Sequence, residues 1–155
     1  MYASRMALRY PVLDPAACTP CGACEVACVA AHEGRDDLRH DDVLVLERRR
    51  LAIRVVAGLP RLDVCTHCPD SPCVRVCPHH ALLRYPGGRV ELLEARCTGC
   101  GACVSACPND GIRRVNVLDL AHKCDGCEGI AGGPACAPAC PSAALTIVDF
   151  PAPHR

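Results

Sequence analysis

Residues 97–108 of the chain read CTGCGACVSACP, four cysteines with the spacing C-x2-C-x2-C-x3-C followed by a proline. In such a run three closely spaced thiolates hold one [4Fe–4S] cluster, and the fourth cysteine reaches a neighbouring cluster. The stretch therefore predicts a fold built from short loops that wrap metal clusters in pairs.

The other cysteines form three more groups of four, making sixteen in a chain of 155 residues. The first group is Cys18, Cys21, Cys24 and Cys28; the second is Cys65, Cys68, Cys73 and Cys77; the third is Cys97, Cys100, Cys103 and Cys107; the fourth is Cys124, Cys127, Cys136 and Cys140. At four thiolates per cluster, this number supplies four [4Fe–4S] clusters with no ligand missing and none left over.

The composition favours a metal-filled interior. The hydrophobic fraction of 50% includes the cysteines, and aromatic residues make up only 3%, with no tryptophan. A chain of this length normally fills its core with large side chains. We therefore expect folding to depend on the metal, because a site that exists only in the folded state makes ligation energy into folding energy.

Several functional classes lack support in the sequence. The formal net charge of +0 argues against a nucleic-acid surface. No dinucleotide fingerprint or P-loop is present, and few residues remain outside the cysteine loops to build a substrate pocket, so we expect no catalytic residue. No apolar run approaches the roughly 18 residues of a membrane span, and the first residues lack a secretory pattern. The expected location is the cytoplasm, or export on a partner that carries the signal.

The spacing of the groups predicts an α+β fold of two nested bacterial-ferredoxin-like units, with short helices, small antiparallel β-ribbons and large cluster-binding loops. The inner unit, residues 61–115, holds the second and third groups. The outer unit, residues 14–60 and 116–150, holds the first and fourth.

Local signals predict individual elements. We expect a helix over residues 23–32 ended by Gly34, and single helical turns before the prolines that follow Cys77, Cys107 and Cys140. Strands are expected at residues 81–83, 111–112, 115–117 and 144–148, with a Gly87-Gly88 hairpin turn.

Residues 42–56 are rich in leucine and β-branched side chains, which predicts two more strands. Arg48, Arg49 and Arg50 fall in the middle of this segment, near the expected turn. They are interpreted either as a solvated hairpin tip or as a docking patch for an acidic partner.

Zinc is the main alternative metal. Structural zinc sites usually take two close cysteine pairs separated by a longer loop. The first and third groups do not follow that pattern, whereas the second and fourth, taken alone, leave zinc open. Disulfides are a weaker alternative because no secretory signal precedes the cysteines.

The chain resembles the four-cluster, ferredoxin-like electron-transfer subunits of the DMSO-reductase type. CTPCGACEVACVAAHEG, CTHCPDSPCVRVCP and KCDGCEGIAGGPACAPACP are similar to the first, second and fourth motifs of that family. The chain also resembles the small subunits of aldehyde oxidoreductase and carbon monoxide dehydrogenase systems. The likeness covers about residues 14–149.

The resemblance implies how the clusters share ligands, since paired groups exchange their fourth cysteines. We define four ligand sets on this basis. The first set is Cys18, Cys21, Cys24 and Cys140; the second is Cys65, Cys68, Cys73 and Cys107; the third is Cys97, Cys100, Cys103 and Cys77; the fourth is Cys124, Cys127, Cys136 and Cys28.

Four other polar residues lie beside ligands. His67 is interpreted either as a donor to a cluster sulfur or as a solvent-facing loop residue. His79 and His80 are expected on the surface. Lys123 precedes Cys124, where its charge would raise a cluster potential, or it is an ordinary loop lysine.

The expected function is electron relay through four [4Fe–4S] clusters by a non-catalytic subunit of an oxidoreductase complex. The favoured partner is a molybdenum or tungsten catalytic subunit, with a further electron-acceptor subunit as a second partner. The alternatives are a relay subunit for carbon monoxide dehydrogenase or hydrogenase, a free polyferredoxin and, last, a zinc-stapled scaffold.

Overall fold

The computed structural model describes residues 8–116, 118 and 120–150. The helices are α1 (Ala23–Glu33), α2 (Val43–Arg48), α3 (Pro72–Val76) and α4 (Ala102–Ala106), with a single 3₁₀ turn at Glu94–Arg96. The strands are β1 (Leu8–Leu13), β2 (Leu51–Val56), β3 (Leu59–Val64), β4 (Leu82–Arg84), β5 (Val90–Leu92), β6 (Ile112–Val115), β7 (Leu120–Lys123) and β8 (Leu145–Phe150). Short helices and short strands confirm the α+β prediction.

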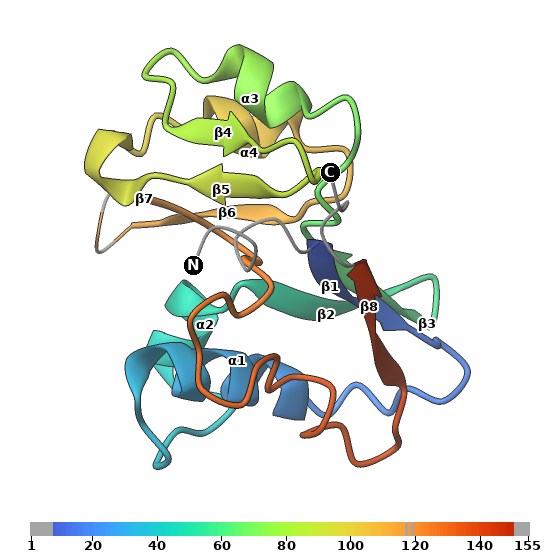
Figure 1. Ribbon diagram of the computed structural model, residues 1–155. Helices are drawn as coiled ribbons and strands as arrows, with labels where there is room; N and C mark the ends of the chain where they lie inside the picture. Colours follow the sequence, from blue (N-terminus) through green and yellow to red (C-terminus); the bar gives the residue numbers. More distant parts are fainter. Residues whose placement is uncertain (1–7, 117, 119, 151–155) are drawn as a thin grey trace.

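The strands form four separate antiparallel ribbons of two strands each: β1 with β8, β2 with β3, β4 with β5, and β6 with β7. In the first ribbon the two ends of the described chain meet, with Leu13 opposite Leu145. Figure 1 shows α3, α4 and β4–β7 in the upper half of the molecule and α1, α2, β1–β3 and β8 in the lower half. The boundaries proposed for the two nested units stay a prediction.

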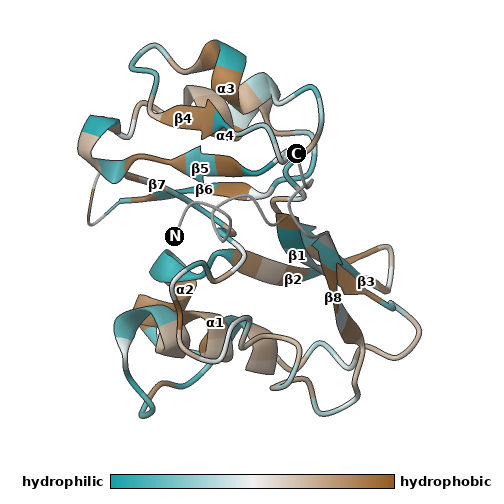
Figure 2. Cartoon of the chain, viewed as in Figure 1, coloured by the Kyte–Doolittle hydropathy of each residue, from teal (hydrophilic) through white to brown (hydrophobic). Residues whose placement is uncertain are grey.

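Cysteine is the most frequent residue in the core. Of the buried apolar residues in the described chain, eight are cysteines and none is aromatic. One buried cluster joins Cys24, Cys28, Leu51, Val64, Cys65, Cys124, Cys136 and Leu145, and another joins Cys73, Leu82, Val90, Cys103, Ile112 and Ala121. Figure 2 shows apolar segments along β4 and β5, which face the second of these cores.

Several local predictions are confirmed. Helix α1 covers residues 23–33 and ends at Gly34, which adopts the left-handed conformation (φ 64°) typical of a helix C-cap. The β4–β5 hairpin turns through Gly87 and Gly88, and α3 and α4 end at Cys77 and Cys107, just before proline. The two strands expected at residues 111–112 and 115–117 are instead one strand, β6, over Ile112–Val115; Asn116 lies in the turn after it, and Val117 lies outside the described residues.

The prediction of two strands within residues 42–56 is wrong in its first half. Residues 43–48 form α2, and the hairpin is instead β2 with β3. The helix buries Val45 completely against α1 while leaving Val43 71% exposed. Packing on α1 therefore overrides the β-propensity of the sequence VLVL.

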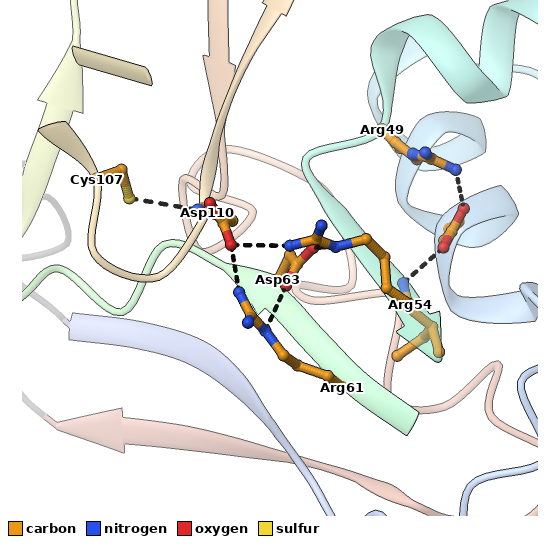
Figure 3. A network of polar contacts seen from close by, with 9 residues as sticks. Arg49, Arg54, Arg61, Asp63, Cys107 and Asp110 are labelled. Carbon is orange, nitrogen blue, oxygen red and sulfur yellow. Dashed lines mark hydrogen bonds and ion pairs between the residues drawn. The ribbon is translucent and has the colours of Figure 1, made fainter. Parts of the chain in front are cut away.

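Both interpretations of the triple arginine are also wrong, because these side chains form ion pairs inside the fold. Arg48 pairs with Glu33, and Arg49 Nη1 lies 2.6 Å from Glu25 Oε2 (Figure 3). Arg50 Nη1 lies 3.7 Å from an oxygen of Asp125. The three arginines join the α2–β2 segment to α1 and to the loop of the fourth group.

A second polar network ties the β2–β3 hairpin to the turn after Cys107 (Figure 3). Arg54 and Arg61 both bind Asp63, which is 1% exposed, and both also bind Asp110. Within the described residues, no helix is long and apolar enough to cross a membrane.

Candidate metal centres

The cysteines of the first set come together from opposite ends of the chain. Cys18, Cys21, Cys24 and Cys140 line one cavity of about 290 Å³, with Leu13, Ile53 and Leu145 as its apolar wall. The β1–β8 ribbon makes this possible, because it holds the approach to the first group beside the strand that follows the fourth.

Two further cavities of about 330 Å³ each contain one predicted ligand set. Cys77, Cys97, Cys100 and Cys103, the third set, line a cavity beside β4, β5 and β7. Cys28, Cys124, Cys127 and Cys136, the fourth set, line another beneath β1 and β8. Each cavity thus contains three cysteines of one group and one cysteine from a different group.

The thiols of the second set lie close enough together to change one another's pKa values. Burial is the largest cause of the raised pKa of Cys73, and the charges of Cys65, Cys68 and Cys107 raise it further. Burial and the charge of Asp70 are the largest causes of the raised pKa of Cys68, and Cys65 and Cys107 raise it further. The structure therefore brings together the members of each of the four sets.

The sets lie in a row. Cys24 of the first set and Cys136 of the fourth share a core, and the charge of Cys136 raises the pKa of Cys24. Cys124 of the fourth set and Cys65 of the second share the same core, and the charge of Cys65 adds to the rise in the pKa of Cys124. The second and third sets share the other core; its members include Cys73 and Cys103. The order in space is therefore first, fourth, second, third.

Exposure follows this order. Cys21 and Cys100 are the two exposed cysteines, and they belong to the two end sets. The fourth set, in contrast, consists entirely of buried cysteines. The row therefore has an exposed cysteine in each end set and none in the two middle sets.

Burial is the largest cause of raised pKa values among these thiols. It raises the pKa of Cys103 to about 11 and that of Cys124 to about 12. Gathering four thiolates in an apolar cavity is unfavourable unless a cation offsets both the desolvation and the mutual repulsion. A metal cluster supplies that positive charge, so the donor set fits a four-iron cluster with cysteine ligands.

The last cysteine of the second, third and fourth groups is followed by the same type of turn. In Cys77, Cys107 and Cys140 the sulfur accepts a hydrogen bond of 3.3 Å from the backbone N–H four residues later, at Ala81, Gly111 and Ala144. The residue just before each donor is left-handed and not a glycine: His80, Asp110 and Ala143.

Sequence reasoning missed this turn. A signal for it exists, because each case reads Cys-Pro-x-x followed by alanine or glycine. Cys28, which has no following proline, lies inside α1 instead, and its sulfur receives a hydrogen bond from the backbone N–H of Arg50. Hydrogen bonds to ligand sulfur are one of the means by which proteins set cluster potentials.

His67 is buried at 2% exposure, so the interpretation of a solvent-facing residue is wrong. Its Nδ1 accepts a hydrogen bond of 2.9 Å from the backbone N–H of Val90. Burial, with Lys123 and Arg89 nearby, lowers the pKa of His67 to about 3, which keeps the ring neutral. His79 and His80 are exposed, as predicted.

Asp125 organises the loop of the fourth group. Its Oδ1 accepts the backbone N–H of Cys127 at 2.8 Å, and its Oδ2 lies 3.1 Å from His32 Nε2. His32 Nδ1 in turn lies 2.7 Å from the carbonyl oxygen of Cys28. Although burial opposes ionisation, the His32 hydrogen bond and Arg50 hold the pKa of Asp125 below its usual range. This chain of contacts fixes Cys28 and Cys127 relative to each other.

Comparison with known proteins shows which iron–sulfur proteins the chain is similar to. A family model described as a 4Fe-4S dicluster domain matches residues 59–150. Electron transport protein HydN of Escherichia coli K12 is 36% identical over 159 residues, covering 91% of this chain and 88% of HydN. The beta subunit of NADH-dependent phenylglyoxylate dehydrogenase from Aromatoleum evansii is 35% identical over 133 residues, covering 85% of this chain and 28% of that subunit.

Among solved structures, the active-site complex BamBC of benzoyl coenzyme A reductase with 1,5-dienoyl-CoA superposes with a TM-score of 0.53. The identity is 20%, and the match covers 96% of this chain and 80% of the other, so this likeness concerns the fold. The predicted resemblance to iron–sulfur electron-transfer subunits is confirmed by the family match and by HydN. Iron–sulfur chemistry is thereby favoured over zinc and over disulfides.

Proposed function

The chain belongs to the 4Fe-4S dicluster domain family, and from this membership we propose that it relays electrons through four [4Fe–4S] clusters. Its sixteen cysteines supply the iron ligands in the four sets defined above. The polypeptide holds the clusters in a row, shields the middle ones from water, and adjusts each potential by charge and by hydrogen bonds to sulfur. It forms no substrate site of its own.

The single observation that carries this proposal is the linear order of the sets. The cysteines at both ends of the row reach the surface at Cys21 and Cys100, whereas the sets between them contain no exposed cysteine. A relay requires this arrangement, since electrons must enter and leave at exposed sites and pass through protected ones. A single storage or structural site would not need two exposed ends.

The proposed partner is a catalytic oxidoreductase subunit of the molybdenum or tungsten type. The names of the relatives support a partner in general terms, because HydN is an electron transport protein and the phenylglyoxylate dehydrogenase relative is a subunit of a larger enzyme. The proposed location is the cytoplasm, or export together with a partner that carries the signal.

Native purification tests the proposal. The chain, tagged and isolated without oxygen from its own organism, is expected to elute at fixed stoichiometry with a larger subunit that contains molybdenum or tungsten. Dithionite-reduced chain should then be reoxidised when the partner's oxidised substrate is added. A lone chain that keeps its iron would instead indicate a freely diffusing polyferredoxin, and nickel in the larger subunit would indicate a hydrogenase or carbon monoxide dehydrogenase.

A further inference from the structure

Lys123 is the single lysine of the sequence, and it is buried. It ends β7, opposite Ile112 of β6, and is 2% exposed. Its Nζ donates a hydrogen bond of 2.7 Å to the carbonyl oxygen of Cys124. None of the ion pairs found in the described part of the chain includes it. A buried ammonium group is normally compensated by an anion, so the missing carboxylate needs an explanation.

Lys123 lies between the second and fourth ligand sets. Its Nζ binds the carbonyl oxygen of Cys124, in the fourth set, and Ala121 on the same strand packs in the core that contains Cys73, of the second set. The two sets adjoin there, since Cys65 and Cys124 belong to the same core. Figure 1 shows β7 running toward the junction of the upper and lower halves before the chain enters the loop of the fourth group.

Other charges near this junction do not replace a counter-ion for Lys123. Asp125 is held by His32 and by the backbone N–H of Cys127. Glu91, Glu94 and Glu128 line the open cleft beside Lys123, but none of the ion pairs found among the described residues joins one of these carboxylates to its ammonium group. We therefore infer that the metal–thiolate clusters on either side would be the large anions that compensate this buried charge.

We propose that Lys123 raises the reduction potentials of the two middle clusters, those of the second and fourth sets, above the values they would otherwise have. The inference rests on the proposed function, since it requires both sets to hold clusters. Each cluster accepts one electron without making or breaking a bond, and the added negative charge is stabilised by the buried cation.

The environment of an end set differs. Beside the first set lies Glu25, which is 1% exposed, and its negative charge raises the pKa of Cys24. Glu25 is compensated by Arg49, so the first set adjoins an ion pair and not a lone buried cation.

The test is an anaerobic redox titration followed by EPR, with Lys123→Gln, Lys123→Arg and Arg96→Gln. Gln removes the charge and keeps a hydrogen-bond donor, whereas Arg keeps the charge. Arg96 is the matched control, because it also directly precedes the first cysteine of a group but is exposed. Lys123→Met replaces Lys123→Gln if the latter does not assemble.

In Lys123→Gln we expect the reduction equilibrium constants of two clusters to fall at least tenfold, which is about 59 mV for a one-electron step. The other two should keep their values, as should all four in Lys123→Arg and Arg96→Gln. Four unchanged midpoints in Lys123→Gln, or equal shifts in the Gln and Arg variants, would overturn the inference. Iron and sulfide are assayed in parallel: wild-type protein that lacks four clusters contradicts the proposed function, whereas intact clusters with unmoved potentials contradict only the role of Lys123.

Discussion

Glu25 offers the sharpest test of how the polypeptide supports a ligand loop. It directly follows Cys24 and is 1% exposed. Its Oε2 accepts from Arg49 at 2.6 Å, and its Oε1 accepts the backbone N–H of Ile53 at 2.7 Å. One carboxylate therefore joins α1 to the α2–β2 segment, beside the first ligand set.

The expected costs follow from these two contacts. Glu25→Ala leaves the Ile53 N–H without its acceptor, worth about 1–3 kcal/mol, and removes a charge-assisted hydrogen bond worth about 1.5–3 kcal/mol. Arg49 is 22% exposed and regains some hydration, so the net loss should be about 3 kcal/mol. Glu25→Gln keeps a neutral acceptor for Ile53 and should lose about 1–2 kcal/mol.

Glu33→Gln is the matched control. Glu33 lies on the same helix and pairs with the neighbouring Arg48, but both side chains are about a quarter exposed (24% and 23%). Partly exposed ion pairs contribute about 0–1 kcal/mol. Glu33→Gln therefore differs from Glu25→Gln in the burial of the ion pair and in the absence of a hydrogen bond to Ile53.

The assay is the rate at which the iron–sulfur absorbance is lost after an anaerobic jump into guanidinium, because cluster loss makes unfolding irreversible. A loss of 3 kcal/mol that falls on the unfolding barrier accelerates bleaching on the order of a hundredfold, since 1.36 kcal/mol corresponds to a factor of ten. If Glu25→Ala bleaches no faster than Glu33→Gln, the buried carboxylate does not hold the loop.

Three further outcomes are expected. Cys28→Ala should remove the cluster of the fourth set and about a quarter of the iron, because each cluster takes its fourth ligand from another group; loss of the first-set signals instead would refute this exchange. Gly111→Ala should strongly destabilise the holoprotein, because a Cβ there would lie 2.4 Å from the backbone of Val64 and Cys65. Gly129→Ala, with nothing within 4 Å of its Cβ, should cost only the roughly 1–2 kcal/mol of a left-handed residue, and equal effects would refute the close-packing argument. Removal of iron by a chelator should abolish the circular dichroism of the fold, since cysteines make up much of the core; an apo chain with native dichroism would contradict metal-dependent folding.

The sequence predicted those parts of the fold that depend on local signals. Gly34 ends α1, and Gly88 lies in the turn of the β4–β5 hairpin; both adopt positive φ angles (64° and 93°), which glycine permits and other residues avoid. The cysteine spacing likewise predicted which residues would lie in loops around a common centre, since three ligands of one cluster are close in the chain.

Features that depend on tertiary contacts were not predictable in this way. Residues 43–48 have strand-like composition but become helical when Val45 packs against α1. The burial of His67 and Lys123 depends on β5 and β7 lying beside the second and fourth groups, and β7 itself is short and carries polar residues. Nothing in the sequence around His67 or Lys123 indicates that either side chain is buried.

The central claim is that four inorganic clusters in a row form the interior of this molecule. The most direct measurement is iron and acid-labile sulfide per chain in anaerobically purified protein, together with Mössbauer spectra. The account predicts about sixteen irons and sixteen sulfides per chain, with every iron in a [4Fe–4S] environment. A folded chain, able to transfer electrons, that contained half that iron or carried zinc in any of the four sets would contradict it.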